Sequence, residues 1–131
     1  MKLVLADTSI WVAHFRQANP VLQSLVTTDH ILCHPLIVIE LACGTPPAPR
    51  ERTLGDLRRL QQGVIATSAE ILALIEDKRC YNTGCGAIDM ALLASTLLTH
   101  NASLWTMNKN LAALAAALGV DFNVASAKPL K

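Results

Sequence analysis

The chain is organised around Gly84-Cys85-Gly86-Ala87-Ile88-Asp89-Met90-Ala91-Leu92-Leu93-Ala94-Ser95, a Gly-rich loop that runs into an apolar helix. One carboxylate, Asp89, lies where the loop and the helix meet. The apolar positions that follow recur at helical spacing, which places Asp89 beside a buried face. A carboxylate there is costly unless a positive group meets it. Because a helix N-terminus offers partial compensation and a bound cation offers more, Asp89 is either a helix-capping residue or a metal ligand.

Length and composition indicate one domain over residues 1–131 with a substantial core. Of the 131 residues, 52% are hydrophobic and only 16% are charged, so much of the chain must be buried. The four cysteines form no C-x-x-C pair, and we expect reduced thiols. No apolar run reaches the roughly 18 residues that span a bilayer, and the opening segment is too short for a signal peptide. We therefore expect a cytoplasmic protein without a membrane partner.

The formal net charge of +1 excludes a strongly basic nucleic-acid binder but allows a local basic strip. Four of the eleven cationic residues fall within ten positions, on a predicted helix. They are Arg50, Arg52, Arg58 and Arg59. A helix face that only meets water explains this pattern at least as well as contacts to phosphate groups.

Hydrophobic spacing predicts alternating strands and helices. We expect strands over residues 3–6, 31–33, 103–106 and 120–124, and either a strand or an extended connection over 63–66. We expect helices over residues 10–17, 20–27, 36–43, 50–61, 68–80, 88–100 and 111–118. The apolar face of the 36–43 helix is expected to include Leu36, Ile39 and Cys43. This alternation is typical of an α/β domain with a mainly parallel sheet.

Polar residues stand at the predicted ends of strands and on one apolar helix. Asp7-Thr8-Ser9 ends the first strand, where parallel sheets form their ligand crevice. Asp7 either points into that crevice or caps the following helix, and both can hold because Ser9 can cap. Glu40 is embedded in an apolar helix, where it is either partnered or directed to water. Asn108 follows the 103–106 strand in a position comparable to that of Asp7.

Acids that converge in a crevice repel one another, and a cation relieves the repulsion. Carboxylate oxygens select Mg²⁺ or Mn²⁺ over metals that prefer thiolates. Metals held in this way activate water and stabilise the oxygens of a phosphodiester under attack. The acids Asp7, Glu40 and Asp89 are therefore candidates for a hydrolytic metal site.

Four segments of the chain, taken in order, form a recognisable pattern: Leu5-Ala6-Asp7-Thr8-Ser9-Ile10-Trp11, His34-Pro35-Leu36-Ile37-Val38-Ile39-Glu40-Leu41-Ala42-Cys43-Gly44, the Gly84 to Ser95 stretch, and Leu104-Trp105-Thr106-Met107-Asn108-Lys109-Asn110-Leu111. With these segments the chain resembles the PIN-domain ribonucleases, specifically the VapC-type toxins of bacterial type II toxin–antitoxin pairs. The resemblance implies a three-layer PIN-like fold and cleavage of RNA that depends on Mg²⁺ or Mn²⁺. It also implies a VapB-type antitoxin that covers the acidic crevice, and a homodimer. By position, the implied metal ligands are Asp7, Glu40 and Asp89, and the supporting hydroxyls are Thr8, Ser9 and Thr106.

One position departs from the family pattern. Where the family usually has a fourth acid, this chain has Asn108, whose amide oxygen can accept a hydrogen bond or bind a cation but carries no charge. The leading hypothesis is an active ribonuclease, with RNA contacts from Lys109 and the four arginines. The alternative is a catalytically weakened PIN domain that binds RNA or its antitoxin. A third hypothesis, a phospho-acceptor receiver domain, ranks behind both. Such a domain has an acidic pair at the end of its first strand, where this chain has only Asp7.

Overall fold

The computed structural model describes residues 2–124, which form three strands and seven helices. The strands are β1 (Leu3–Ala6), β2 (Ile31–Leu32) and β3 (Ala102–Trp105). The helices are α1 (Thr8–Arg16), α2 (Pro20–Thr27), α3 (Pro35–Ala42), α4 (Arg50–Arg59), α5 (Ser68–Asp77), α6 (Ala87–Leu98) and α7 (Lys109–Ala117). None of the described helices is long and apolar enough to cross a membrane.

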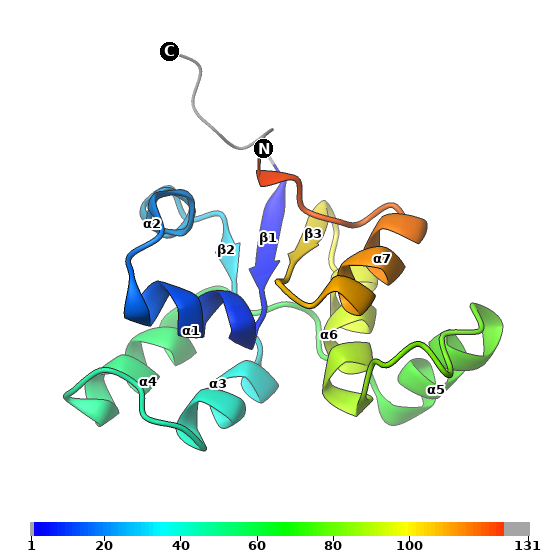
Figure 1. Ribbon diagram of the computed structural model, residues 1–131, viewed down its shortest axis with the longest axis horizontal. Coiled ribbons are helices and arrows are strands. Elements are labelled where there is room, and N and C mark those ends of the chain that lie inside the picture. The colour runs from blue at the N-terminus through cyan, green and yellow to red at the C-terminus, as the bar shows by residue number, and fades with distance from the viewer. Residues whose placement is uncertain (1, 125–131) are drawn as a thin grey trace, which may run out of the picture.

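The sheet is parallel throughout, with strand order β2-β1-β3. In the central strand, Leu5 pairs with Leu32 on one side and Leu104 on the other. Figure 1 shows all three strands running in one direction, with α1 to α4 on the β2 side and α5 to α7 on the β3 side. The carboxyl ends of β1 and β3 therefore open at one edge of the sheet. This architecture confirms the predicted α/β, PIN-like fold class.

The core explains why the Gly84 to Ser95 stretch organises the chain. Every residue of α6 from Met90 to Thr96 is buried, and this helix packs against β3. A strand buried on both faces needs a continuous apolar run, and the exposed fractions of Val4 and Leu5 are at most 1%. Each large side chain buried in this way contributes about 1.5–3 kcal/mol.

Two predictions about local structure are wrong. In α3 the buried residues are Ile37 and Leu41, whereas Ile39 and Cys43 are exposed, because α1 and α4 pack on the other side of the helix. Residues 120–124 do not form a strand over their length. Within the described residues they contribute only an isolated parallel bridge between Asp121 and Leu104.

Residues 63–66 form a connection without regular secondary structure, not a strand. The preceding residue, Gln62, makes an isolated parallel bridge with Cys33. All four cysteines are free, as expected.

Candidate active site

Asp7 is held in one orientation at the end of β1. It is the N-cap of α1, and its Oδ1 accepts hydrogen bonds from the Ile10 N–H at 3.3 Å and from the Ser9 hydroxyl at 2.5 Å. Its Oδ2 accepts from the Thr106 hydroxyl. Asp7 as a whole residue is only 5% exposed. Of the two alternatives for Asp7, its role as the cap of the following helix is confirmed, and Ser9, which could have capped the helix, instead donates to Asp7.

The end of β3 is tied to the end of β1 through the same hydroxyl groups. The Met107 N–H donates to the Ser9 hydroxyl at 3.0 Å, and the Asn108 N–H donates to the Thr106 hydroxyl at 3.0 Å. Asn108 is the N-cap of α7, with its Oδ1 accepting from the N–H groups of Asn110 and Leu111 at 2.9 and 3.3 Å. The side chain at this position therefore has a structural duty.

Glu40 joins this network from α3. Its Oε1 accepts a hydrogen bond of 2.5 Å from the hydroxyl of Thr8, the residue that follows Asp7. Both side chains are partly buried. The predicted acid on the apolar helix is therefore partnered, and its partner belongs to the same turn of chain as Asp7.

Asp89 lies in the first turn of α6 and accepts a hydrogen bond from the Gly86 N–H at 3.3 Å. Figure 1 shows that this turn lies at the same end of the sheet as the carboxyl ends of β1 and β3. The preceding loop passes close to α7, since a Cβ added to Gly84, whose φ is +84°, would lie 2.5 Å from the Asn110 side chain. Of the two roles predicted for Asp89, helix capping and metal binding, the structure shows the interaction with the helix terminus. No described hydrogen bond joins it to Asp7 or Glu40.

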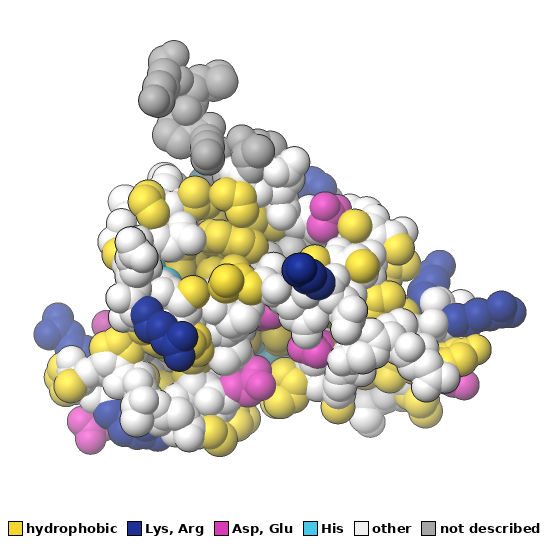
Figure 2. Space-filling model, in the orientation of Figure 1, with side chains coloured by type: hydrophobic (Ala, Val, Ile, Leu, Met, Phe, Trp, Pro, Cys, Tyr) yellow, Lys and Arg dark blue, Asp and Glu magenta, His cyan; other side chains and the backbone are white. Residues whose placement is uncertain are grey.

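Figure 2 shows acidic side chains gathered between the α3 and α6 parts of the molecule. Within residues 2–124, no three His, Cys, Asp or Glu side chains lie close enough to hold one metal ion together. Mg²⁺, however, binds through one or two carboxylates, retains several waters and adds substrate phosphates. Asp7 and Glu40, linked through adjacent residues, supply hard oxygen ligands of that kind. The donor set therefore fits Mg²⁺ or Mn²⁺.

Of the five cationic side chains predicted to bind RNA, two are bonded within the protein and three are exposed. Arg50 donates to the backbone carbonyls of Ala42 and Gly44, and Arg59 pairs with Asp56 on its own helix. The remaining predicted cations, Arg52, Arg58 and Lys109, are exposed. Figure 2 shows Lys and Arg side chains spread over the visible face rather than gathered in a strip.

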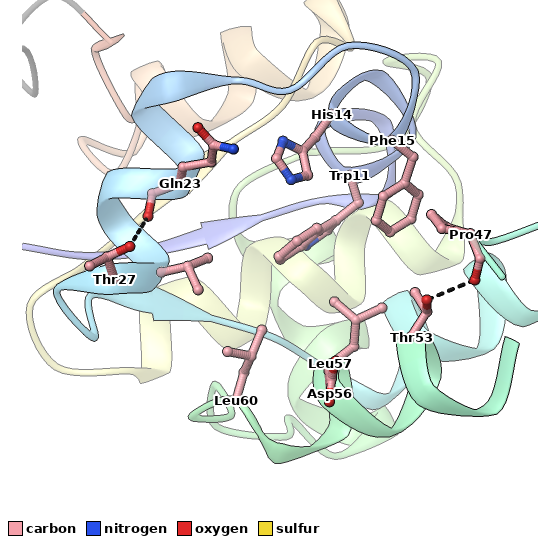
Figure 3. A pocket seen from close by; sticks show the side chains of 11 residues that line it. Trp11, His14, Phe15, Gln23, Thr27, Pro47, Thr53, Asp56, Leu57 and Leu60 are labelled. Carbon is pink, nitrogen blue, oxygen red and sulfur yellow. Dashed lines mark hydrogen bonds between the residues drawn. The ribbon is translucent and has the colours of Figure 1, made fainter. Parts of the chain in front are cut away.

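A pocket that the sequence did not predict lies between α1, α2 and α4 (Figure 3). It has a volume of about 540 Å³, and its α1 wall carries Trp11, His14 and Phe15 with ring centroids 6.0–6.1 Å apart. Burial lowers the pKa of His14, whose Nδ1 accepts from the Asn19 N–H. The indole N–H of Trp11 is buried without a hydrogen-bond partner among the described residues. The signal for this pocket was the placement of three rings at helical spacing on α1.

Comparison with known proteins places the chain in a family by its sequence. No family model matches the chain. The chain is 40% identical over 118 residues to Ribonuclease VapC32 of Mycobacterium tuberculosis, both in strain CDC 1551 / Oshkosh and in strain ATCC 25618 / H37Rv. The alignment covers 90% of this chain and 94% of each relative. By this likeness over almost its whole length, the chain belongs to the VapC-type ribonucleases of the PIN-domain family.

Proposed function

We propose that this chain is the toxin of a bacterial type II toxin–antitoxin pair and hydrolyses RNA phosphodiester bonds with Mg²⁺ or Mn²⁺. One observation carries the proposal: the buried Asp7 carboxylate is fixed by three donors where β1 and β3 end, with Glu40 bonded to the next residue. The 40% identity to a protein named as a ribonuclease supports the substrate class.

The side chains divide the work. Because no three such side chains of residues 2–124 lie close enough to share one ion, Asp7 and Glu40 would hold the cation, and Asp89 would add its negative charge from the first turn of α6. Once bound, a divalent cation lowers the pKa of water and stabilises the charge that develops on the phosphate. The hydroxyls of Ser9 and Thr106 keep the Asp7 carboxylate in one orientation, so no reorganisation is needed when substrate arrives.

Metal binding can be tested by thermal unfolding. Clustered carboxylates gain most when a cation neutralises them, so millimolar Mg²⁺ or Mn²⁺ should raise the melting temperature. Asp89→Asn should reduce that gain, whereas Glu76→Gln, a change at an exposed acid of α5, should preserve it. A melting temperature that does not respond to either metal would count against the site.

The decisive activity experiment compares the wild type with Asp7→Asn on purified RNA, with Mg²⁺, with Mn²⁺ and with EDTA. The proposal expects cleavage by the wild type with metal and none by Asp7→Asn. The second candidate, a catalytically weakened PIN domain, is favoured by one observation, the engagement of Asn108 Oδ1 with two backbone N–H groups. RNA binding without cleavage above that of Asp7→Asn would support this second function.

The apolar surfaces suit the expected protein partners. The Trp11 pocket in Figure 3 could receive an apolar segment of a VapB-type antitoxin, and Phe15 and Pro47 line both this pocket and the one beside Glu40. A homodimer would cover exposed apolar side chains such as Ile39 and Ile65, which are 55% and 62% exposed. Light scattering after size-exclusion chromatography should report a dimer for the wild type and a smaller mass for Ile39→Lys.

A further inference from the structure

A second pocket opens directly beside Glu40. It has a volume of about 490 Å³ and lies between the C-terminal half of α1, the end of α3 and the loop of residues 43–49. Its walls include Phe15 and Arg16 from α1, Glu40 from α3, and Thr45 and Pro46 from the loop. This volume is within the range of pockets that hold one small ligand.

The loop wall of this pocket is held in place by the protein itself. The Arg50 guanidinium donates to the carbonyl of Ala42 at 2.5 Å and to that of Gly44 at 3.2 Å. The Thr53 hydroxyl donates to the Pro47 carbonyl at 2.7 Å. Prolines in the loop restrict its backbone further. Because the wall is formed before a ligand binds, little binding energy is lost in ordering it.

The positive charge in the pocket comes from Arg16, the exposed last residue of α1, whereas Glu40 contributes a carboxylate to the α3 wall. Among residues 2–124 the one ion pair joins Arg59 to Asp56, so Arg16 has no acidic partner at ion-pair distance. A guanidinium free of a carboxylate is suited to a phosphate group, which it binds through two parallel hydrogen bonds. The neighbouring Phe15 ring offers a face on which an unpaired base can stack.

We propose that this pocket holds one nucleotide of single-stranded RNA next to the bond to be cut, with its phosphate on Arg16 and its base against Phe15. The inference rests on the proposed function, because Glu40 joins the pocket to the acidic site. It assigns an RNA contact to Arg16, a residue outside the predicted basic cluster. It gives Arg50 a different role, which is to hold the wall of the pocket.

The test measures binding of a fluorescein-labelled 12-nucleotide single-stranded RNA by anisotropy at several salt concentrations. The proteins carry Asp7→Asn so that cleavage does not interfere. Adding Arg16→Gln should weaken binding about tenfold at low salt and lower the slope of log affinity against log salt by about 0.7. Phe15→Leu should weaken binding about tenfold with the slope unchanged. Arg79→Gln, which removes the same charge from an exposed position beyond α5, is the matched control and should change neither quantity.

The outcomes separate the pocket from the proposed function. Wild-type cleavage against that of Asp7→Asn tests the function alone. If the wild type cleaves RNA but Arg16→Gln binds as well and with the same salt slope as Arg79→Gln, the pocket assignment is overturned while the function stands. If no cleavage occurs but Arg16→Gln alone weakens binding and lowers the slope, the pocket is supported and the ribonuclease proposal fails.

Discussion

Replacing Asn108 with Asp tests what a fourth acid would do at the end of β3 without disturbing the fold. Asn108 Oδ1 caps α7 through the N–H groups of Asn110 and Leu111. Asn and Asp are equally good N-caps, so Asn108→Asp should keep both hydrogen bonds. The added negative charge at a helix N-terminus contributes about 0.3–1 kcal/mol. In EDTA this gain is opposed by the repulsion between the new carboxylate and Asp7, so the free energy of unfolding should stay close to that of the wild type.

The chemical effect should be larger than the structural one. The Asn108 N–H donates to the Thr106 hydroxyl, which itself donates to Asp7, so the new charge would lie close to the metal-binding acids. Charge-assisted contacts contribute about 1.5–3 kcal/mol against about 1 kcal/mol for neutral ones. At about 1.4 kcal/mol per factor of ten, Asn108→Asp should raise metal affinity and the rate of RNA cleavage about tenfold or more. Toxicity to cells should rise with them.

The assay combines melting temperatures over a Mg²⁺ titration with cleavage rates for four proteins: wild type, Asn108→Asp, Asn108→Ala and Asp7→Ala. Asn108→Ala loses the cap, at about 1 kcal/mol or about 4 °C, and should gain no metal affinity. The reasoning is refuted if Asn108→Asp leaves metal affinity, cleavage and toxicity unchanged while Asp7→Ala abolishes cleavage. Three acids would then suffice, and the family's fourth acid would be dispensable in this chain.

Two further predictions concern stability. Gly63→Ala alone should destabilise by about 1–3 kcal/mol, because its Cβ would lie 2.6 Å from the buried Ser95 Oγ. In a Ser95→Ala background Gly63→Ala should be tolerated, because the atom nearest to the new Cβ would then be Thr99 Oγ1 at 3.6 Å. Equal losses of stability in the two backgrounds, measured by urea unfolding, would contradict this packing. Burial lowers the pKa of His34, whose Nδ1 caps α3 by accepting from the Leu36 N–H. As the pH falls below about 6.5, the His34 imidazole binds a proton in the unfolded chain before it does so in the folded chain, so the free energy of unfolding should fall. Urea midpoints measured from pH 7.5 to 5 should show this fall, and His34→Asn should make it smaller.

The sequence predicted the elements whose hydrophobic pattern is unambiguous. It did not predict the buried face of a helix in which nearly every position is apolar. The continuous apolar run of residues 3–6 was sufficient to predict β1, and the helical spacing of apolar residues was sufficient to predict α6. In α3, almost every position is apolar, so periodicity could not decide between Ile37 and Ile39 as the buried residue. Packing against α1 and α4 makes that choice, and only the tertiary structure shows it.

The candidate site was predictable in its members but not in its connections. Asp7 and Glu40 could be named from their places after a strand and on an apolar helix, and Thr106 from the resemblance to the PIN-domain family. The hydrogen bond from Thr106 to Asp7 spans 99 positions, and the one from Thr8 to Glu40 spans 32, so no local pattern could indicate either. The Trp11 pocket was missed for a similar reason, because its walls come from three helices.

At this site the candidate metal-binding residues also stabilise helix N-termini, and this second role explains how buried acids are tolerated there. Asp7 caps α1, Asp89 accepts from the N–H of Gly86, the N-cap residue of α6, and Asn108 caps α7. Three helices thus begin near the carboxyl ends of β1 and β3, and each directs the positive end of its dipole and free N–H groups toward that region. This lowers the cost of burying carboxylates when no cation is bound, and the same fields favour an anionic phosphate. It follows that replacing Asp7 with Ala removes both a helix cap and a charge, whereas Asn keeps one oxygen for the cap but loses the charge and the oxygen that accepts from Thr106. The Asn variant therefore separates the loss of chemistry from the loss of the helix cap.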